Sequence, residues 1–282
     1  MDKLKLILIR ILAVLTTIVV AIGLLLAKVT LYNPTHLQIR YETIVDSKIP
    51  SEIKDLTVVY FTDLQYGQFQ DDARMEQLVK KINELNPQVI IFGGDLYDTT
   101  TKITKKTNKK IVKWLSKLNA PFGKYAVYGE KDLKDEETKE TVKSIYKDSQ
   151  FELLTNSSVH IGLYTRKGIR LIGFSSNPNY EKALQNVISS EYNIVVTHKP
   201  DNLLDDSLSS ISLGLAGHSH GTQITYPIIG PYRTIKGASK LNRSQSASLP
   251  FPYIISSGVG CTKVDARLNA DPEIYYIVFK NK

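Results

Sequence analysis

The chain has 282 residues, of which 42% are hydrophobic, and its formal net charge is +8. This length favours one large domain with a short appendage, and the composition supplies enough apolar residues for a substantial core. The positive surplus is mild and no nucleic-acid-binding motif accompanies it, so nucleic acid is not expected as a partner. Cys261 is the only cysteine, which excludes an intrachain disulfide and does not decide the redox compartment.

An apolar run at the amino terminus is the first predicted element. Residues 11–27, extended through residues 6–9, give an apolar span of about 20 residues, which is enough to cross a bilayer. A cleaved signal peptide would have a shorter apolar region and an A-x-A-like site after it, whereas Lys-Val-Thr-Leu-Tyr follows here at residues 28–32. We therefore predict that residues 1–28 form an uncleaved, single-pass transmembrane signal anchor.

The charges beside this run predict its orientation in the cell membrane. Lys3, Lys5 and Arg10 precede the centre of the run, which favours a cytoplasmic amino terminus and an extracytoplasmic domain. Lys28 and Arg40 on the far side weaken this asymmetry. The membrane is accordingly a predicted partner of the chain.

The rest of the chain divides into a linker and one domain. Residues 29–50 are predicted to be a linker bounded by Pro34 and Pro50, with an edge strand possible at 38–43, and residues 51–282 are predicted to be the domain. Apolar residues at helical spacing predict helices at 72–85, 106–118 and 136–146, and they alternate with apolar strands as in βαβ units. The predicted strands are 56–61, 89–92, 125–128, 171–174, 193–197, 211–216, 223–226, 253–256 and 274–279, and residues 236–252 are predicted to be a loop.

Seven lysines gather on and before the second predicted helix, between Lys102 and Lys117. A solvated helix face explains them without any partner. Contact with anionic lipid near the anchor is the alternative, because each basic residue adds about 1 kcal/mol at such a surface.

Five of the predicted strands run directly into a residue that can bind a metal. Asp63, Asp95 and Glu130 follow the first three of these strands, His198 follows the fourth, and His218-Ser219-His220 follows the fifth. In open α/β sheets, ligands bind at the carboxyl ends of strands, so we expect these side chains to converge. Carboxylates mixed with imidazoles suit a divalent transition metal, or two such ions.

The order of these motifs resembles the calcineurin-like metallophosphoesterase superfamily, and in particular its bacterial subgroup with an amino-terminal membrane segment. The motifs are Asp63-Leu64-Gln65, Gly94-Asp95-Leu96-Tyr97-Asp98, Gly129-Glu130-Lys131-Asp132, His198 and Gly217-His218-Ser219-His220. The similarity extends from about residue 56 to the carboxyl terminus and includes the glycine-rich tail from Ser256 to Ile274.

This resemblance implies a four-layer α/β/β/α sandwich preceded by one transmembrane helix, and a site for two divalent ions. By resemblance, Asp63 and His220 bind the first metal, Asp95 bridges both, and His198 and His218 bind the second. Asp98 is expected to orient a neighbouring ligand and not to bind metal itself.

Three positions depart from the pattern of the superfamily. Gln65 stands where a histidine is usual, Glu130 replaces an asparagine ligand, and Lys131 replaces a histidine that assists catalysis. We expect Gln65 and Glu130 to act as oxygen ligands, which favours Mn²⁺ or Mg²⁺ over Zn²⁺, with Fe²⁺ also in the range and Mn²⁺ preferred. Lys131 and Asp132 are the predicted catalytic residues of this motif.

Lys131 leaves two alternatives, and so does the function. Its ammonium can stabilise phosphoryl oxygens, or it can pair with Glu130 and fill the place of the second metal. The first alternative predicts a membrane-anchored, metal-dependent phosphoesterase that hydrolyses a phosphomonoester, phosphodiester or pyrophosphate, in a small or lipid-linked substrate. The second predicts a catalytically degenerate domain of the same fold, acting as a membrane-tethered binding or scaffold protein.

Overall fold

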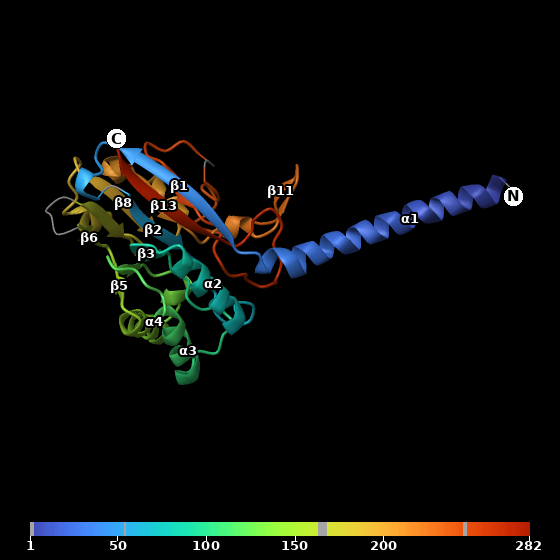
Figure 1. Cartoon of the computed structure of the whole chain (residues 1–282), viewed down its shortest axis with the longest axis horizontal. Coiled ribbons are helices and arrows are strands. Elements are labelled where there is room, and N and C mark those ends of the chain that lie inside the picture. Colours follow the sequence, from blue (N-terminus) through green and yellow to red (C-terminus); the bar gives the residue numbers. More distant parts are fainter. Residues whose placement is uncertain (1–2, 54, 163–167, 245–246) are drawn as a thin grey trace.

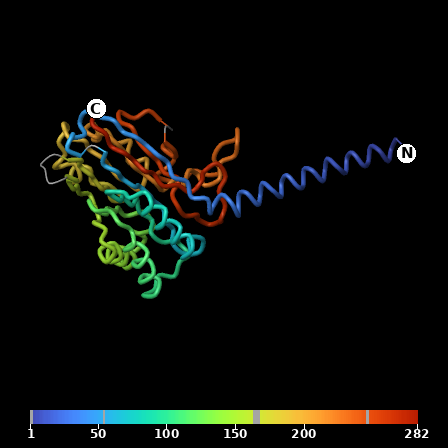
Figure 2. Tube along the Cα trace, viewed as in Figure 1, coloured from blue at the N-terminus to red at the C-terminus, as the bar shows by residue number. Residues whose placement is uncertain are grey.

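Two β-sheets packed face to face form the centre of the domain (Figure 1). The computed structural model describes residues 3–53, 55–162, 168–244 and 247–282. Figure 2 shows the amino-terminal segment projecting away from the domain, while the carboxyl terminus lies on the domain itself.

The first sheet has six strands in the order β1-β13-β2-β3-β4-β5. Neighbouring strands are parallel except β13 and β2, which are antiparallel. The bounds are β1 Gln38–Asp46, β2 Leu56–Phe61, β3 Val89–Phe92, β4 Lys124–Ala126, β5 Phe151–Leu153 and β13 Glu273–Asn281. The strands β2, β3 and β4 point their carboxyl ends in one direction, which brings the residues after them to one edge.

The second sheet has five strands in the order β12-β9-β8-β7-β6, and a two-stranded hairpin lies outside both sheets. The bounds are β6 Ser157–Ile161, β7 Ile169–Gly173, β8 Tyr192–Thr197, β9 Leu213–Ala216 and β12 Tyr253–Ile255, with β10 Thr225–Tyr226 and β11 Gly230–Pro231 in the hairpin. Only β6 runs antiparallel to its neighbour in the five-stranded sheet.

Every α-helix except the first packs on the outer face of one of the sheets. The bounds are α1 Lys3–Ala27, α2 Asp72–Glu84, α3 Lys105–Leu115, α4 Glu136–Asp148 and α5 Tyr180–Leu184. The helices α2, α3 and α4 each have a side-chain cap at the amino terminus. Asp71, Thr104 and Asp135 each accept a hydrogen bond from the backbone N–H three residues later. The predicted helices are therefore confirmed to within a few residues.

Alternate residues of each strand face different layers, as the two-residue period of a strand requires. In β2, Val59 and Phe61 face α2, α3 and α4, whereas Val58 and Tyr60 face the second sheet. In β8, Val195 faces the outer layer that contains α5. Three hydrophobic clusters thus separate four layers, and the predicted α/β/β/α sandwich is confirmed.

Helix α1 is long and apolar enough to cross a membrane, the one such helix among the described residues, and none of its residues is buried in the domain. It continues through a π-helical turn at Lys28–Tyr32 and a short helix at Asn33–Thr35. Strand β1 then pairs in parallel with β13 from Gln38 to Asp46. The predicted edge strand is therefore present and longer than expected, and the segment 29–50 predicted as a linker supplies an integral strand of the first sheet.

The seven lysines around α3 form an exposed surface of the domain. The buried residues of this helix are Ile111 and Leu115, and its lysines lie on the outer face. Lys110 pairs with Asp72, and Lys117 lies over the ring of Trp114. In Figure 1, α3 lies at the far side of the domain from the hairpin that contains β11.

Candidate metal centre

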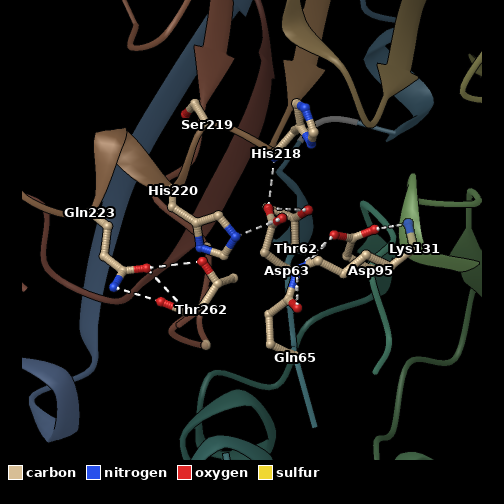
Figure 3. A network of polar contacts seen from close by, with 12 residues as sticks. Thr62, Asp63, Gln65, Asp95, Lys131, His218, Ser219, His220, Gln223 and Thr262 are labelled. Carbon is tan, nitrogen blue, oxygen red and sulfur yellow. Dashed lines mark hydrogen bonds and ion pairs between the residues drawn. The ribbon is translucent and has the colours of Figure 1, made fainter. Parts of the chain in front are cut away.

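The predicted ligands gather where the two sheets present the carboxyl ends of their central strands (Figure 3). Asp63 follows β2, Asp95 follows β3, and His198 follows β8. These three residues are buried, and each offers one ligand atom within 4.8 Å of the other two. His218 and His220 come from the turn after β9 and are also buried.

The backbone at this edge is held in an uncommon conformation. Asp63, Asp95, His218 and His220 have φ angles of 53°, 60°, 64° and 51°, in the left-handed region that side-chain-bearing residues rarely adopt. Gly258 has a φ of 70°, and a Cβ at this position would lie 2.6 Å from Cβ of Asp63. Strain of this kind persists where the surrounding structure imposes it, and it concentrates at functional sites.

His198 and His218 aim their free nitrogens at one another. Nδ1 of His198 lies 2.9 Å from the carbonyl oxygen of Gly93, and Nε2 of His218 lies 2.9 Å from that of Lys236. A carbonyl only accepts hydrogen bonds, so Nδ1 of His198 and Nε2 of His218 carry hydrogens. In neutral rings, Nε2 of His198 and Nδ1 of His218 then bear lone pairs. Those two nitrogens are 3.2 Å apart, and Oδ1 of Asp95 is 3.4 Å from Nε2 of His198. Such an arrangement requires a cation, either a proton or a metal ion.

Asp63 has one oxygen held and one oxygen free. Its Oδ2 accepts hydrogen bonds from Oγ1 of Thr62 at 3.0 Å and from the backbone N–H of His218 at 2.8 Å. Its Oδ1 is buried without a hydrogen-bond partner, 3.5 Å from Nε2 of His220 and 3.9 Å from Nε2 of His198. A buried carboxylate oxygen flanked by imidazoles fits a divalent transition metal.

The charges of the site follow from this burial. Burial lowers the pKa of His198, but the carboxylates of Asp95 and Asp63 outweigh it and raise that pKa to about 9. Burial lowers the pKa of His220 to about 3, and burial with the neighbouring His198 lowers the pKa of His218. Burial opposes ionisation of Asp95, yet His198 and Lys131 hold the pKa of that carboxyl well below its usual range. Two positive charges, on His198 and Lys131, therefore lie beside two carboxylates and two neutral imidazoles, and a divalent ion would take the place of the His198 proton.

Gln65 and Lys131 both contact Oδ2 of Asp95. Nε2 of Gln65 donates to Oδ2 of Asp95 at 3.0 Å, and Nζ of Lys131 lies 3.4 Å from the same oxygen. Nζ of Lys131 also donates to Oε1 of Gln65, and its backbone N–H donates to Oδ1 of Asp95 at 2.8 Å. The amide oxygen of Gln65, predicted as a metal ligand, is thus turned to the lysine in this arrangement.

Glu130 lies at the rim of the site. Its carboxylate accepts Nζ of Lys199 at 2.8 Å, and its side chain is 52% exposed. Burial opposes its ionisation, but the contact with Lys199 lowers its pKa. The pairing of Lys131 with Glu130 considered from the sequence is not formed, because each of the two side chains has another partner.

Asp132 and Asp98 both bind backbone near the site. The Asp132 carboxylate accepts N–H groups of Asp95, Leu96 and Gly129 at 3.0, 2.9 and 2.7 Å. Burial and the charge of Asp95 raise the pKa of Asp132 to about 6. Asp98 accepts the N–H of Thr100 at 2.9 Å. Asp132 was predicted to be catalytic. Because its carboxylate ties the loops after β3 and β4 together, this geometry favours a positioning role for it.

Arg267 is a site residue that the sequence did not single out. Its side chain is fully buried, and its guanidinium donates to the backbone carbonyls of His220, Ser257, Gly258, Gly260 and Ala270. It therefore fixes both the turn that carries His220 and the glycine-rich loop against Asp63. Its signal in the sequence is its place in the glycine-rich tail that resembles the membrane-anchored subgroup.

Several known proteins are similar to this chain in sequence. The sequence model described as calcineurin-like phosphoesterase matches residues 56–222. The chain is 27% identical over 253 residues to the uncharacterized metallophosphoesterase YkuE of Bacillus subtilis, covering 88% of this chain and 87% of that protein. It is 24% identical over 240 residues to the UDP-2,3-diacylglucosamine pyrophosphatase LpxG of Chlamydia muridarum, covering 66% of this chain and 70% of the other.

Among solved structures, the calcineurin-like phosphoesterase YfkN of Bacillus subtilis covers 73% of this chain, and the chain covers 82% of YfkN, with 14% identity and a TM-score of 0.46. The family match spans more than half of the chain and ends just beyond the last of the predicted histidine ligands, His220. The chain belongs to the calcineurin-like phosphoesterase family.

Proposed function

We propose that this protein is a membrane-anchored, metal-dependent phosphoesterase whose substrate is a lipid-linked phosphomonoester, phosphodiester or pyrophosphate. The observation that carries the proposal is the pair of buried nitrogens of His198 and His218, which face one another at 3.2 Å beside Asp95. In the metal-free chain the proton of His198, whose pKa is about 9, lies at this place, and a divalent ion would displace it. The unpartnered oxygen of Asp63, which faces His198 and His220, also fits a cation.

The residues of the site have separate tasks in this proposal. Asp63, Asp95, His198, His218 and His220 would hold two divalent ions, with Mn²⁺ preferred, and the ions would supply Lewis acidity and a water of lowered pKa. The ammonium of Lys131, which is partly exposed, lies where it can stabilise the charge of a phosphoryl group. The carboxylate of Asp132 keeps Asp95 in place by accepting the backbone N–H of Asp95. Lys199 and Glu130, at the rim, can contact the remainder of the substrate.

Two observations favour a lipid-linked substrate. Helix α1 is a candidate membrane anchor, which would keep the domain at the bilayer surface. The relative from Chlamydia muridarum carries the name UDP-2,3-diacylglucosamine pyrophosphatase, which denotes a substrate with both acyl groups and a pyrophosphate.

A catalytically degenerate binding or scaffold domain is the second candidate, and one observation favours it. Gln65 and Lys131 both occupy Oδ2 of Asp95, the oxygen that a bridging carboxylate would turn to one of the two metals. If they stay there, the site holds one ion or none, and hydrolysis fails.

The test is hydrolysis of a bis-aryl phosphate by the full-length protein in detergent, with Mn²⁺, Mg²⁺, Fe²⁺ or Zn²⁺ added after chelation. We expect Mn²⁺ to support activity and His218→Ala to lower it at least about 100-fold, the scale of one essential electrostatic or ligand contact. His36→Ala is the matched control, because His36 is exposed and lies outside the site. Inactivity with all four metals, in protein that elemental analysis shows to be metal-free, would favour the degenerate domain.

A further inference from the structure

Apolar side chains gather on the hairpin that follows the last metal-binding motif. After residue 35, the described residues expose eight large hydrophobic side chains, and five of them lie in this hairpin or in the loop opposite: Tyr226, Ile228, Ile229, Tyr232 and Val264. Ile228 is fully exposed and has a φ of 71°, an outlier for a β-branched residue. An aqueous environment accounts neither for the exposed apolar side chains nor for the strained backbone of Ile228. Contiguous exposed apolar groups mark a binding surface.

Hydrogen bonds connect this hairpin to the end of the anchor. The N–H of Arg267 donates to the carbonyl of Val29 at 3.0 Å, and the next residue, Leu268, forms a bridge with Ile224. The N–H of Tyr232 donates in turn to Ile224 at 2.9 Å. Neighbouring segments in such a ladder are about 5 Å apart, so the hairpin begins within about 15 Å of the anchor. Figure 1 shows β11 beside the junction of α1 with the domain.

A cleft of about 590 Å³ lies between the hairpin and the loop at 262–264. His220 and Ser219 line its inner end, and Ile224, Tyr232, Ile235 and Val264 supply apolar walls. Arg233 and Lys263 stand on its lining with exposed side chains. This volume is in the range of pockets for small molecules and cofactors, and the basic residues suit an anionic headgroup.

The hairpin also contacts the metal centre through the segment that follows it. The carbonyl of Lys236, four residues after Tyr232, accepts Nε2 of His218 at 2.9 Å. The hairpin, the cleft and His220 therefore lie between the domain end of α1 and the predicted ligands.

We propose that the hairpin at residues 226–232 rests in the interface of an anionic bilayer, and that the cleft beside it receives the lipid part of a lipid-linked phosphate from that bilayer. This inference rests on the proposed function, since the phosphate meets the centre of Asp63, Asp95 and the histidines. The strained, exposed Ile228 then faces acyl chains and not water. Lys263 and Arg233 lie at the level of the lipid phosphates.

The first experiment locates the hairpin without using activity. The full chain is reconstituted in vesicles of phosphatidylcholine and phosphatidylglycerol, with part of the phosphatidylcholine brominated on its acyl chains as a quencher of tryptophan fluorescence. Ile229→Trp should be quenched by about twofold or more after subtraction of the native Trp114 signal, as expected for a side chain in the acyl boundary. Ile188→Trp is the control, because Ile188 is also exposed but precedes β8, at the opposite end of that strand from His198. Equal quenching of the two variants overturns the seating of the hairpin.

The second experiment compares two substrates in the same vesicles. A variant with both Ile228→Ser and Ile229→Ser should hydrolyse a soluble aryl phosphate as fast as the wild type. It should lose about fivefold or more of the rate on phosphatidic acid or CDP-diacylglycerol, because only these substrates use the lipid path. A wild type that hydrolyses the aryl phosphate but neither lipid, or a variant that loses both rates equally, overturns the lipid path. A wild type inactive on every substrate refutes the proposed function instead, and the quenching result still decides whether the hairpin meets the bilayer.

Discussion

Replacing Lys131 with methionine tests how the site balances its charges. Nζ of Lys131 lies 3.4 Å from Oδ2 of Asp95, a carboxylate whose side chain is 2% exposed, while the lysine side chain is 22% exposed. At that distance the attraction is about 5 kcal/mol for an effective dielectric constant of about 20 and about 1 kcal/mol in water. The partly exposed lysine places this pair between the two limits. Methionine keeps the length of the side chain and removes only the charge.

The expected effects on the metal-free and the metal-loaded protein have opposite signs. Without metal, Asp95 loses a partner for its buried charge, which costs about 3 kcal/mol and lowers the melting temperature by roughly 6–12 °C. With metal, the ammonium no longer competes for Oδ2, and Oε1 of Gln65 becomes free as a ligand. We expect the affinity for Mn²⁺ to rise roughly 10- to 100-fold, or about 1.4–2.7 kcal/mol, which lies within the electrostatic range above.

The assay is calorimetric titration of the chelator-treated full chain with Mn²⁺, together with thermal melting with and without the ion. Lys134→Met is the control, since Lys134 is exposed and the substitution removes the same charge three residues away. An unchanged melting temperature in the metal-free variant, together with equal or weaker Mn²⁺ binding, would refute the electrostatic reasoning. It would mean that Lys131 does not neutralise Asp95.

Turnover of the same variant separates the two functions. If Lys131 stabilises the phosphoryl group, Lys131→Met loses on the order of 10²–10³ in rate despite its tighter metal binding. If Lys131 blocks a metal, the wild type is inactive, and Lys131→His combined with Glu130→Asn restores the usual residues of the family and should create activity. A wild type that is active and insensitive to Lys131 contradicts both alternatives.

Four further predictions follow from particular contacts. Asp132→Asn should weaken Mn²⁺ binding about 10- to 100-fold with all ligands intact, because one carboxylate oxygen fewer holds the loops, and titration calorimetry checks this. Arg267→Lys should lower the melting temperature by roughly 6–12 °C, since three donors cannot serve five buried carbonyls and each orphan costs about 1–3 kcal/mol; an unchanged melting temperature would contradict the carbonyl cage. The folded-state pKa of His198, about 9, lies above its unfolded value, so the stabilisation that this group contributes is fully present below pH 6.5 and is lost as the pH rises toward 9. Denaturation with chelator should show that the free energy of unfolding falls by up to about 3 kcal/mol over this range, and His198→Asn should abolish the fall. Protease added to intact spheroplasts should digest the domain while α1 is retained, and full protection would place the domain in the cytoplasm.

Much of the fold could be predicted from periodicity because its elements are long and buried on one side. The helices α2, α3 and α4 carry apolar residues at helical spacing, and their positions match the structure. Short elements such as β5, β6 and α5 have three to five residues each, too few for a period to be recognised. Strand β1 was extended beyond its predicted end because its partner β13 lies more than 200 residues away, and no local pattern records that pairing.

The identity of the ligands could be predicted, but the partners of the departing residues could not. A carboxylate or histidine directly after a buried strand is a local signal, and Asp63, Asp95 and His198 gather as that signal indicates. The partner of Glu130 is Lys199, 69 positions further along the chain, and only the packing of the two sheets brings them together. The same holds for Arg267, whose guanidinium contacts five carbonyls that no pattern of side chains predicts.

The contact between α1 and the domain determines which face of the domain lies beside the end of α1. A flexible tether of 22 residues, as residues 29–50 were predicted to be, would span about 25 Å on average and would let any face turn to the bilayer. In the structure, Nδ2 of the buried Asn33 donates to the carbonyl of Arg267 at 2.7 Å, and the N–H of Arg267 donates to Val29. The guanidinium of the same arginine reaches the carbonyl of His220. Because Arg267 joins the end of α1 to the turn that carries His220, the orientation of the candidate metal centre relative to α1 is set by folding. Asn33→Ala removes the side-chain contact alone, and the Arg267–Val29 hydrogen bond and the pairing of β1 with β13 still hold the end of α1 to the domain.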